Sequence, residues 1–395
     1  MKDMNKWFLW AAGALISVLA CERLDDKPET YLQEPIPTRR ISLEDVAGIL
    51  GSINLGSAQM EEVYDAVSAS AGNGYDSEYR MTELFESPGA GVGSEASETK
   101  AYAAPLRDLI REAVYQRQAT KAGGEGVDPE EFLEKLSSSD AQIYWPFSES
   151  WDGETSPIVT FDPGDNSTRN IAYCRGEDGH VEEVIVDEKM ASERPVWVVN
   201  WNDDASYRSL EMLRREDPSW GSGGGEILVK SDFGEDDGEP RTLVLRSFKA
   251  NRNYDSWFAG GSEFFVKCGA IEDFTASTDA ELRLYEPSIT DFMIVVRRDQ
   301  VGQALPFNAV LVSEWTELLT NCAFMMIEDD GGAQTNWKCS AVVKYNSKSY
   351  GFEIDLPLRT RDDIVWRGTL NRNYIERFDG QEGHFGDVDL VLEFI

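Results

Sequence analysis

The feature that most constrains the fold is a long series of short β-branched and aromatic runs in the second half of the chain. Between Glu226 and the last residue, turns rich in Asp, Gly and Asn divide these runs. Several runs alternate polar and apolar residues, as a sheet with one solvated face requires. No internal repeat of fixed period accompanies them, and their spacing is typical of an antiparallel sandwich. We therefore predict a two-sheet β-sandwich over residues 221–395, built from runs such as EILVKS, TLVLRSF, SEFFVKCG, AVLVSEW and DVDLVLEF.

Residues 41–140 have a helical period instead. After Pro105, which suits a first helical turn, apolar residues recur with the i, i+3, i+4, i+7, i+8 spacing of one helix face. Ser42 and the sequence Asp128-Pro129 are typical helix starts. We expect a small helical domain here. Its clearest apolar stripe consists of Leu106, Leu109, Ile110, Ala113 and Val114.

The period changes at Ile143. Short strand-like runs follow, namely IYWPF, IVTF, IAYC, VEEVIV and PVWVV, with turns such as DPGDN and GEDG between them. We assign residues 141–220 to a β-rich middle region, which the flexible sequence GSGGG joins to the sandwich. The predicted fold class is therefore α+β and mainly β, with a small N-terminal helical region, a β-rich region and a C-terminal antiparallel β-sandwich.

The first twenty residues have the pattern of an export signal. Lys2 and Lys6 precede an apolar stretch, Trp7–Ala20, that is shorter than the roughly 20 residues of a membrane-spanning helix. The sequence VLAC that ends at Cys21 resembles a lipobox, where signal peptidase II cleaves before a lipidated cysteine. This resemblance implies that residues 1–20 are a lipoprotein signal peptide and that Cys21 carries the lipid. The alternatives are an uncleaved apolar anchor and a general secretory signal with a coincidental cysteine.

Residues 21–40 form an acidic tether that begins CERLDDKPE. It resembles the export signal of surface lipoproteins in Bacteroidetes-type bacteria, although Lys27 follows the acidic residues instead of preceding them. The resemblance implies an outer-membrane lipoprotein at the cell surface of the bacterial envelope, attached to the membrane through the lipid on Cys21. The alternative is a disordered tether of ordinary acidic composition.

Charge and histidine content exclude several classes of function. The chain has 37 Lys and Arg against 72 Asp and Glu, a formal net charge of −35 that repels nucleic acid, so we expect no nucleic-acid partner. Its two histidines, His180 and His384, both stand beside glycine in turn-like contexts. Zinc hydrolases and Ser-His-Asp triads are therefore disfavoured. The SxxK match of Ser97 with Lys100 lacks the other motifs of its enzyme class. We assign no catalytic residue, no metal and no cofactor.

Three acidic clusters have oxygen ligands of the kind that calcium prefers, but none has EF-hand spacing. With 72 acidic residues in the chain, such clusters are expected by accident, so we favour solvated turns over calcium sites. The clusters are residues 162–166, 235–237 and 328–330.

Aromatic side chains are the candidates for a binding surface. Exposed Trp and Tyr rings stack on sugars or anchor protein partners, whereas alternating Trp residues in strands are more often core. Trp257-Phe258, beside two glycines, is a similar candidate in a loop. The candidate ligand contacts are Tyr144, Trp145, Trp151 and Trp201.

The cysteines beyond Cys21 leave two interpretations open. Cys322 and Cys339 lie in strand-like runs on either side of a turn, where they would face each other. An exported chain permits disulfides, but buried free thiols that behave as small apolar side chains fit equally well. The remaining two are Cys174 and Cys268.

The segments YWPFSESWDG and PVWVVNWND are similar to uncharacterised lipoproteins of gut-type Bacteroidetes. The resemblance implies export and a helical-plus-β layout, and it transfers no functional residue except Cys21. Our first hypothesis is a non-enzymatic, lipid-anchored envelope protein with a role in binding or assembly. The alternatives are a glycan-binding component of a nutrient-uptake system and a hydrolase that uses acidic residues alone or with calcium.

Overall fold

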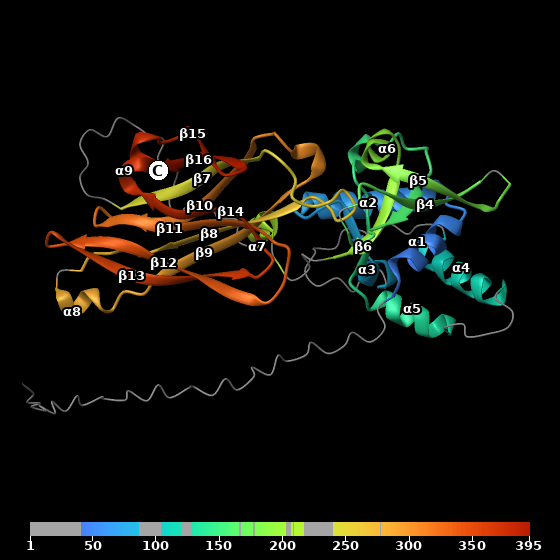
Figure 1. Ribbon diagram of the computed structural model, residues 1–395, viewed down its shortest axis with the longest axis horizontal. Coiled ribbons are helices and arrows are strands. Elements are labelled where there is room, and N and C mark those ends of the chain that lie inside the picture. Colours follow the sequence, from blue (N-terminus) through green and yellow to red (C-terminus); the bar gives the residue numbers. More distant parts are fainter. Residues whose placement is uncertain are drawn as a thin grey trace, which may run out of the picture. The chain divides into compact units, whose positions relative to one another are not determined.

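The computed structural model confirms a mixed α+β, mainly β chain, in which N-terminal helices are followed by three sheets (Figure 1). Residues from Ile41 to Ile395 form one compact unit. The signal peptide, Cys21, the tether, Ser97 and Lys100, the cluster 235–237 and the run EILVKS lie outside the described residues. The structure describes residues 41–86, 104–120, 128–165, 167–176, 178–202, 207, 209–216, 240–276 and 278–395.

The first sheet has the order β1-β2-β6-β3-β4-β5. Its neighbours run antiparallel except β3 and β6, which are parallel. The strands are β1 (Glu78–Arg80), β2 (Ala141–Tyr144), β3 (Ile158–Phe161), β4 (Arg169–Arg175), β5 (Val181–Asp187) and β6 (Val196–Trp201).

The N-terminal helices share one hydrophobic core with this sheet. Apolar residues of all five helices pack with Ile143, Val159 and Trp197, so residues 41–140 have no core separate from the strands that follow. The predicted starts are present: Ser42 accepts a hydrogen bond from the backbone of Asp45, and Asp128 accepts one from Glu130. The helices are α1 (Leu43–Ser52), α2 (Ser57–Gly72), α3 (Met81–Phe85), α4 (Leu106–Thr120) and α5 (Pro129–Ser137).

The C-terminal strands form two antiparallel sheets around a second common core, as the strand pattern predicted. The smaller sheet has the order β10-β7-β16-β15, and the larger has the order β13-β12-β11-β8-β9 with β14 also paired to β11. Alternate residues of the last strand, from Val388 to Phe394, are buried in this core. The strands are β7 (Arg241–Ala250), β8 (Ser262–Ala270), β9 (Ser288–Val296), β10 (Leu305–Trp315), β11 (Leu319–Glu328), β12 (Gln334–Tyr345), β13 (Lys348–Arg359), β14 (Asp363–Asn371), β15 (Glu382–Phe385) and β16 (Val388–Phe394).

Short helices occupy several connections. No helix in the described part of the chain is both long and apolar enough to cross a membrane. The short helices are η1 (Ser148–Ser150), α6 (Glu188–Glu193), α7 (Leu210–Glu216), α8 (Asp279–Leu282), η2 (Arg298–Gln300) and α9 (Arg372–Arg377).

The loop between β7 and β8 links the sandwich to the first sheet. Trp257 and Phe258, the loop candidates for ligand contact, are buried in a third apolar cluster with Tyr144 and other residues of the first sheet. The indole Nε1 of Trp257 donates a hydrogen bond to the carbonyl of Thr168 (3.1 Å), and Asn200 of β6 donates to the carbonyl of Phe258 (3.1 Å). This pair is therefore core, and it anchors one half of the unit to the other.

All four cysteines of the described chain are free thiols. Cys322 on β11 pairs in register with Leu370 of β14, and Cys339 on β12 pairs with Ile354 of β13. The predicted facing of Cys322 and Cys339 is therefore wrong, because β12 pairs with β11 only near Leu319 and Asn321, and β14 lies beside Cys322. A hydrogen bond with Cys322, together with burial, raises the pKa of Cys268 well above its usual value. Of the two interpretations, free thiols are the one observed, with Cys268 and Cys322 buried and Cys174 and Cys339 half-buried.

Candidate functional site

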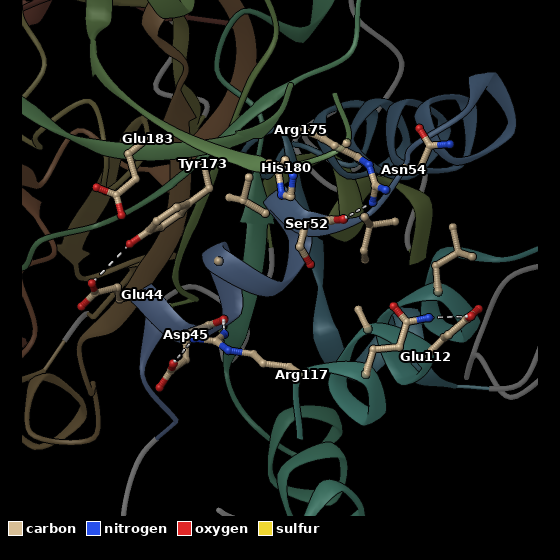
Figure 2. Close-up of a pocket in the computed structure, with 17 residues that line it drawn as sticks. Glu44, Asp45, Ser52, Asn54, Glu112, Arg117, Tyr173, Arg175, His180 and Glu183 are labelled. Atoms are coloured by element: carbon tan, nitrogen blue, oxygen red, sulfur yellow. Dashed lines mark hydrogen bonds and ion pairs between the residues drawn. The ribbon is translucent and has the colours of Figure 1, made fainter. Parts of the chain in front are cut away.

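A polar groove lies between α1, α4 and the hairpin of β4 and β5 (Figure 2). Its volume is about 1050 Å³. Helix α1 and the residues after it form one side of the groove. Helix α4 forms the second side, and the β4–β5 hairpin forms the third. The charged and aromatic groups that line the groove are Glu44, Asp45, Glu112, Arg117, Tyr173, Arg175, His180 and Glu183.

The position of α1 is set by the absence of a side chain at Gly51. A Cβ atom there would lie 2.5 Å from the Cβ of Tyr173 and 2.8 Å from its carbonyl oxygen, so only glycine permits this approach of helix to strand. The apolar face of α1, with Val46 and Leu50, is buried in the core below. Its polar face, with Glu44 and Asp45, is consequently turned to the groove (Figure 2).

Hydrogen bonds from two arginines connect the sides of the groove. The Arg117 guanidinium on α4 donates to the Asp45 carboxylate (3.0 Å) and to the Asp45 carbonyl (3.1 Å) on α1. From the hairpin, Arg175 donates to the carbonyl of Ser52 (2.9 Å). These contacts hold α1 against both neighbours and order the side chains that surround the cavity.

Tyr173 is the aromatic side chain among the groove residues. Its hydroxyl donates to a carboxylate oxygen of Glu44 (3.2 Å). Partial burial, followed by the negative charge of Glu44, raises the pKa of Tyr173 above its usual value. The phenol is thus neutral, and it is a hydrogen-bond donor at neutral pH.

The aromatic residues predicted from the sequence lie elsewhere, in the core. Tyr144 is 2% exposed and Trp145 is 1% exposed, so neither ring can contact a ligand in the folded protein. Trp151 and Trp201 are half-buried and pack against the helix-bearing core. The Trp145 ring centroid lies 5.5 Å from that of Trp151 and 5.9 Å from that of Trp197. Of the two interpretations of these aromatics, the burial supports core packing.

His180 and the acidic cluster 162–166 occupy turns, whereas His384, also expected in a turn, lies in strand β15. His180 is exposed at the groove, and its backbone N–H donates to Asp178 (2.9 Å) in the hairpin turn. Asp162 and Asp165 accept hydrogen bonds from the backbone two residues on, as in ordinary Asx turns. These contacts support the turn interpretation for His180 and for residues 162–166.

The cluster 328–330 divides in the fold. Glu328 is buried at the end of β11, whereas Asp330 is exposed and Asp329 forms an ion pair with Arg359 (3.1 Å). Two carboxylates from other segments, Asp255 and Glu263, lie beside Glu328 instead. The three residues are not adjacent along the chain, so the sequence gives no signal that pairs them.

The groove residues were also missed. The polar faces of α1 and α4 follow from the helical period, but nothing in the sequence places the hairpin of β4 and β5 beside them. No family model, no curated protein and no solved structure matches the chain. The groove therefore has to be interpreted from its own chemistry.

Proposed function

We propose that the protein is a non-enzymatic, lipid-anchored protein of the bacterial outer membrane that faces outward and binds a ligand in the groove between α1, α4 and the β4–β5 hairpin. The lipobox-like sequence at Cys21 supports attachment through lipid, and the acidic residues after it support the outward orientation. The observation that carries the binding role is the groove itself, a polar cavity of about 1050 Å³ with ordered side chains on three sides.

The ligand class that fits this lining best is carbohydrate. Sugars present many hydroxyl groups, which pair with carboxylates and guanidinium groups, and an apolar ring face, which stacks on an aromatic side chain. The groove offers Glu44 and Glu183 as acceptors, Arg175 as a donor and the Tyr173 ring as a stacking surface. This moves the expected glycan contact from the buried Trp145 to Tyr173.

The charge of the groove favours a neutral glycan. Four carboxylates, from Glu44, Asp45, Glu112 and Glu183, outnumber the guanidinium groups of Arg117 and Arg175. Asp45 already pairs with Arg117, and the chain as a whole carries a net charge of −35. An anionic polysaccharide would therefore be repelled.

The hydrolase hypothesis receives less support. In the described chain, three carboxylates that lie close together are those of Asp255, Glu263 and Glu328. Two of them, the glutamates, are buried. A polymeric substrate cannot reach such side chains without local unfolding. Acid catalysis by the groove carboxylates would need a pair at a defined separation on either side of a bound sugar.

Binding of purified protein to an array of neutral glycans, followed by calorimetric titration of the hits, tests the proposal. We expect Tyr173→Ala to lose binding about tenfold or more, because stacking on an aromatic ring contributes about 1–3 kcal/mol. Tyr173→Phe keeps the ring and should retain most of the affinity. Tyr115→Ala, which removes an exposed ring outside the groove, serves as the control. Silence of the wild-type protein on the array, or equal affinity of Tyr173→Ala, would refute the carbohydrate assignment.

A further inference from the structure

Three carboxyl groups from separate segments lie close together near the β7–β8 loop, which packs against the first sheet. Asp255 belongs to the loop between β7 and β8, Glu263 is near the start of β8, and Glu328 ends β11. One oxygen from each group lies within 4.8 Å of the others. Glu328 is 1% exposed and Glu263 is 7% exposed, while Asp255 is half-buried.

Glu328 has no hydrogen-bond partner for either of its carboxylate oxygens among the described residues, and both oxygens are shielded from solvent. The same holds for Oδ2 of Asp255. Burial of a carboxylate without a hydrogen bond or an opposite charge costs free energy. Native proteins therefore pair such groups, protonate them or use them to bind metals.

The guanidinium of Arg298, whose charge acts on Asp255, has other hydrogen-bond partners. Arg298 donates through Nη2 to the main-chain carbonyl of Asp255 (2.7 Å) and through Nη1 to Glu188 (2.8 Å). Its positive charge acts on Asp255 from a distance, but its Nε has no hydrogen-bond partner in the described chain. The carboxylates of Asp255 and Glu328 thus form no direct salt bridge with Arg298.

A shared proton is the competing explanation. Burial, together with Asp255, raises the pKa of Glu328 to about 11, and burial raises the pKa of Asp255 to about 6. When one of the two is protonated, it can donate a hydrogen bond to the other. A proton compensates one negative charge, whereas a divalent cation compensates two.

We propose that Asp255, Glu263 and Glu328 bind a divalent cation, and that this cation is Ca²⁺. The ligands are all carboxylate oxygens, which suit hard cations and exclude a soft-metal site. Calcium–oxygen distances of roughly 2.3–2.6 Å separate opposite ligand oxygens by up to about 5 Å, a span that accommodates this cluster. Magnesium retains several water molecules and dehydrates reluctantly, so a site this deeply buried favours calcium.

The position of the site gives the cation a structural role that does not depend on the groove. Asp255 stands two residues before Trp257, in the loop whose aromatic pair is buried against the first sheet. Glu263 and Glu328 lie on neighbouring strands of the sandwich. A cation bound to all three would fix this loop to the sandwich, and its removal would loosen the connection between the sandwich and the first sheet.

The test uses the full-length protein in detergent, first stripped with a chelator and then dialysed. We expect calorimetric titration with CaCl₂ to give one buried site, and MgCl₂ to bind at least tenfold more weakly. At a Ca²⁺ concentration a hundredfold above Kd, thermal unfolding should shift upward by about 3 °C or more. Elemental analysis of dialysed protein gives the stoichiometry independently.

Glu328→Gln removes one charge and one ligand, and it should abolish both the heat of binding and the thermal shift. Glu353→Gln, the same change at an exposed position of β13, is the matched control and should keep both. Because a buried substitution can impair folding, Asp255→Asn in the half-buried loop provides a second variant. If chelation leaves the melting temperature unchanged and Glu328→Gln binds Ca²⁺ like the wild type, the cluster is held by a shared proton and the proposal is wrong.

Discussion

Gly51 of α1 and Tyr173 of β4 are in such close contact that a Cβ atom at Gly51 would lie 2.5 Å from the Cβ of Tyr173. Real Cβ contacts are longer, so this helix can lie on this strand only with glycine at position 51. The contact fixes the depth of the groove, because Glu44 and Asp45 stand on the same helix and Tyr173 is part of the lining. One missing methyl group thus sets the geometry of the proposed binding site.

We predict that Gly51→Ala destabilises the protein by about 1–3 kcal/mol, since the added methyl group must displace either α1 or β4. Alanine has a higher helix propensity than glycine by about 1 kcal/mol, and this gain offsets only part of the destabilisation. Chemical denaturation measures the difference. Gly48→Ala in the same helix is the control: its Cβ would meet only Nη1 of Arg117 at 3.6 Å, an ordinary contact. Equal stabilisation by both substitutions would show that α1 does not pack tightly on β4.

Phe258→Ala tests the anchor between the first sheet and the sandwich. Phe258 is 0% exposed and its cluster includes Tyr144 and Val198, so we expect a loss of about 3–5 kcal/mol of unfolding free energy. Phe378→Ala, at a residue that is 38% exposed, should cost less than about 1.5 kcal/mol. Thermal unfolding followed by tryptophan fluorescence and by circular dichroism compares them. A similar small loss in both variants would mean that the loop does not anchor the two halves.

The lowered pKa of Asp389 leads us to expect that the stability of the fold decreases in acid. A hydrogen bond with His384 (2.6 Å), aided by one from Lys249 (3.0 Å), lowers the pKa of Asp389 from 3.8 to about 2. A carboxyl whose pKa is lower in the folded state stabilises the fold above its unfolded pKa, and this contribution disappears as pH falls from about 4 toward 2. Asp389→Asn should therefore lower the melting temperature at pH 6 and make progressively less difference below pH 4.

The control for Asp389 is Glu286→Gln, which neutralises an exposed carboxyl of the sandwich half. Its melting temperature should stay close to that of the wild type across the same pH range, because surface charge changes of this kind have small effects. A constant difference between Asp389→Asn and the wild type from pH 7 to pH 3 would contradict the proposed contribution of the pair with His384.

Cys21→Ser tests the membrane attachment. If signal peptidase II processes the chain at Cys21, the serine variant cannot accept the diacylglyceryl group and should accumulate as an unlipidated precursor. Labelling with radioactive palmitate in growing cells measures this directly. Cys174→Ser, which alters a cysteine of the first sheet, should incorporate label like the wild type. Undiminished labelling of Cys21→Ser would show that the lipid is attached elsewhere, and an unlabelled wild type would favour an uncleaved anchor.

The local elements were largely predictable. The stripe from Leu106 to Val114 became the buried face of α4, and the alternation from Val388 to Phe394 became the inner face of β16. Both patterns depend only on which residues an element of known period turns to one side. Strand order was beyond this reasoning, because the parallel pairing of β3 with β6 joins segments separated by two other strands.

Side-chain environments were the least predictable property. Tyr144 and Trp145 are residue types that are common at binding surfaces. In the fold, however, the rings of Tyr64 on α2 and Trp197 on β6 cover Trp145. Sequence spacing gives the direction in which a strand residue points, but it does not tell which remote element covers that face. The same limit applied to Cys322 and Cys339, because Cys322 lies opposite Leu370 of β14 and Cys339 lies opposite Ile354 of β13.

By itself, the sequence determined the periods of helix and strand and the fold class; it also provides the basis for proposing lipid attachment at Cys21. Only the tertiary structure decided where charge is buried and where it surrounds a cavity. Glu44, Arg117 and Tyr173 come from three segments, as do Asp255, Glu263 and Glu328. Period is a property of neighbours along the chain, whereas the desolvation and partners of a carboxylate depend on residues that only folding brings into contact.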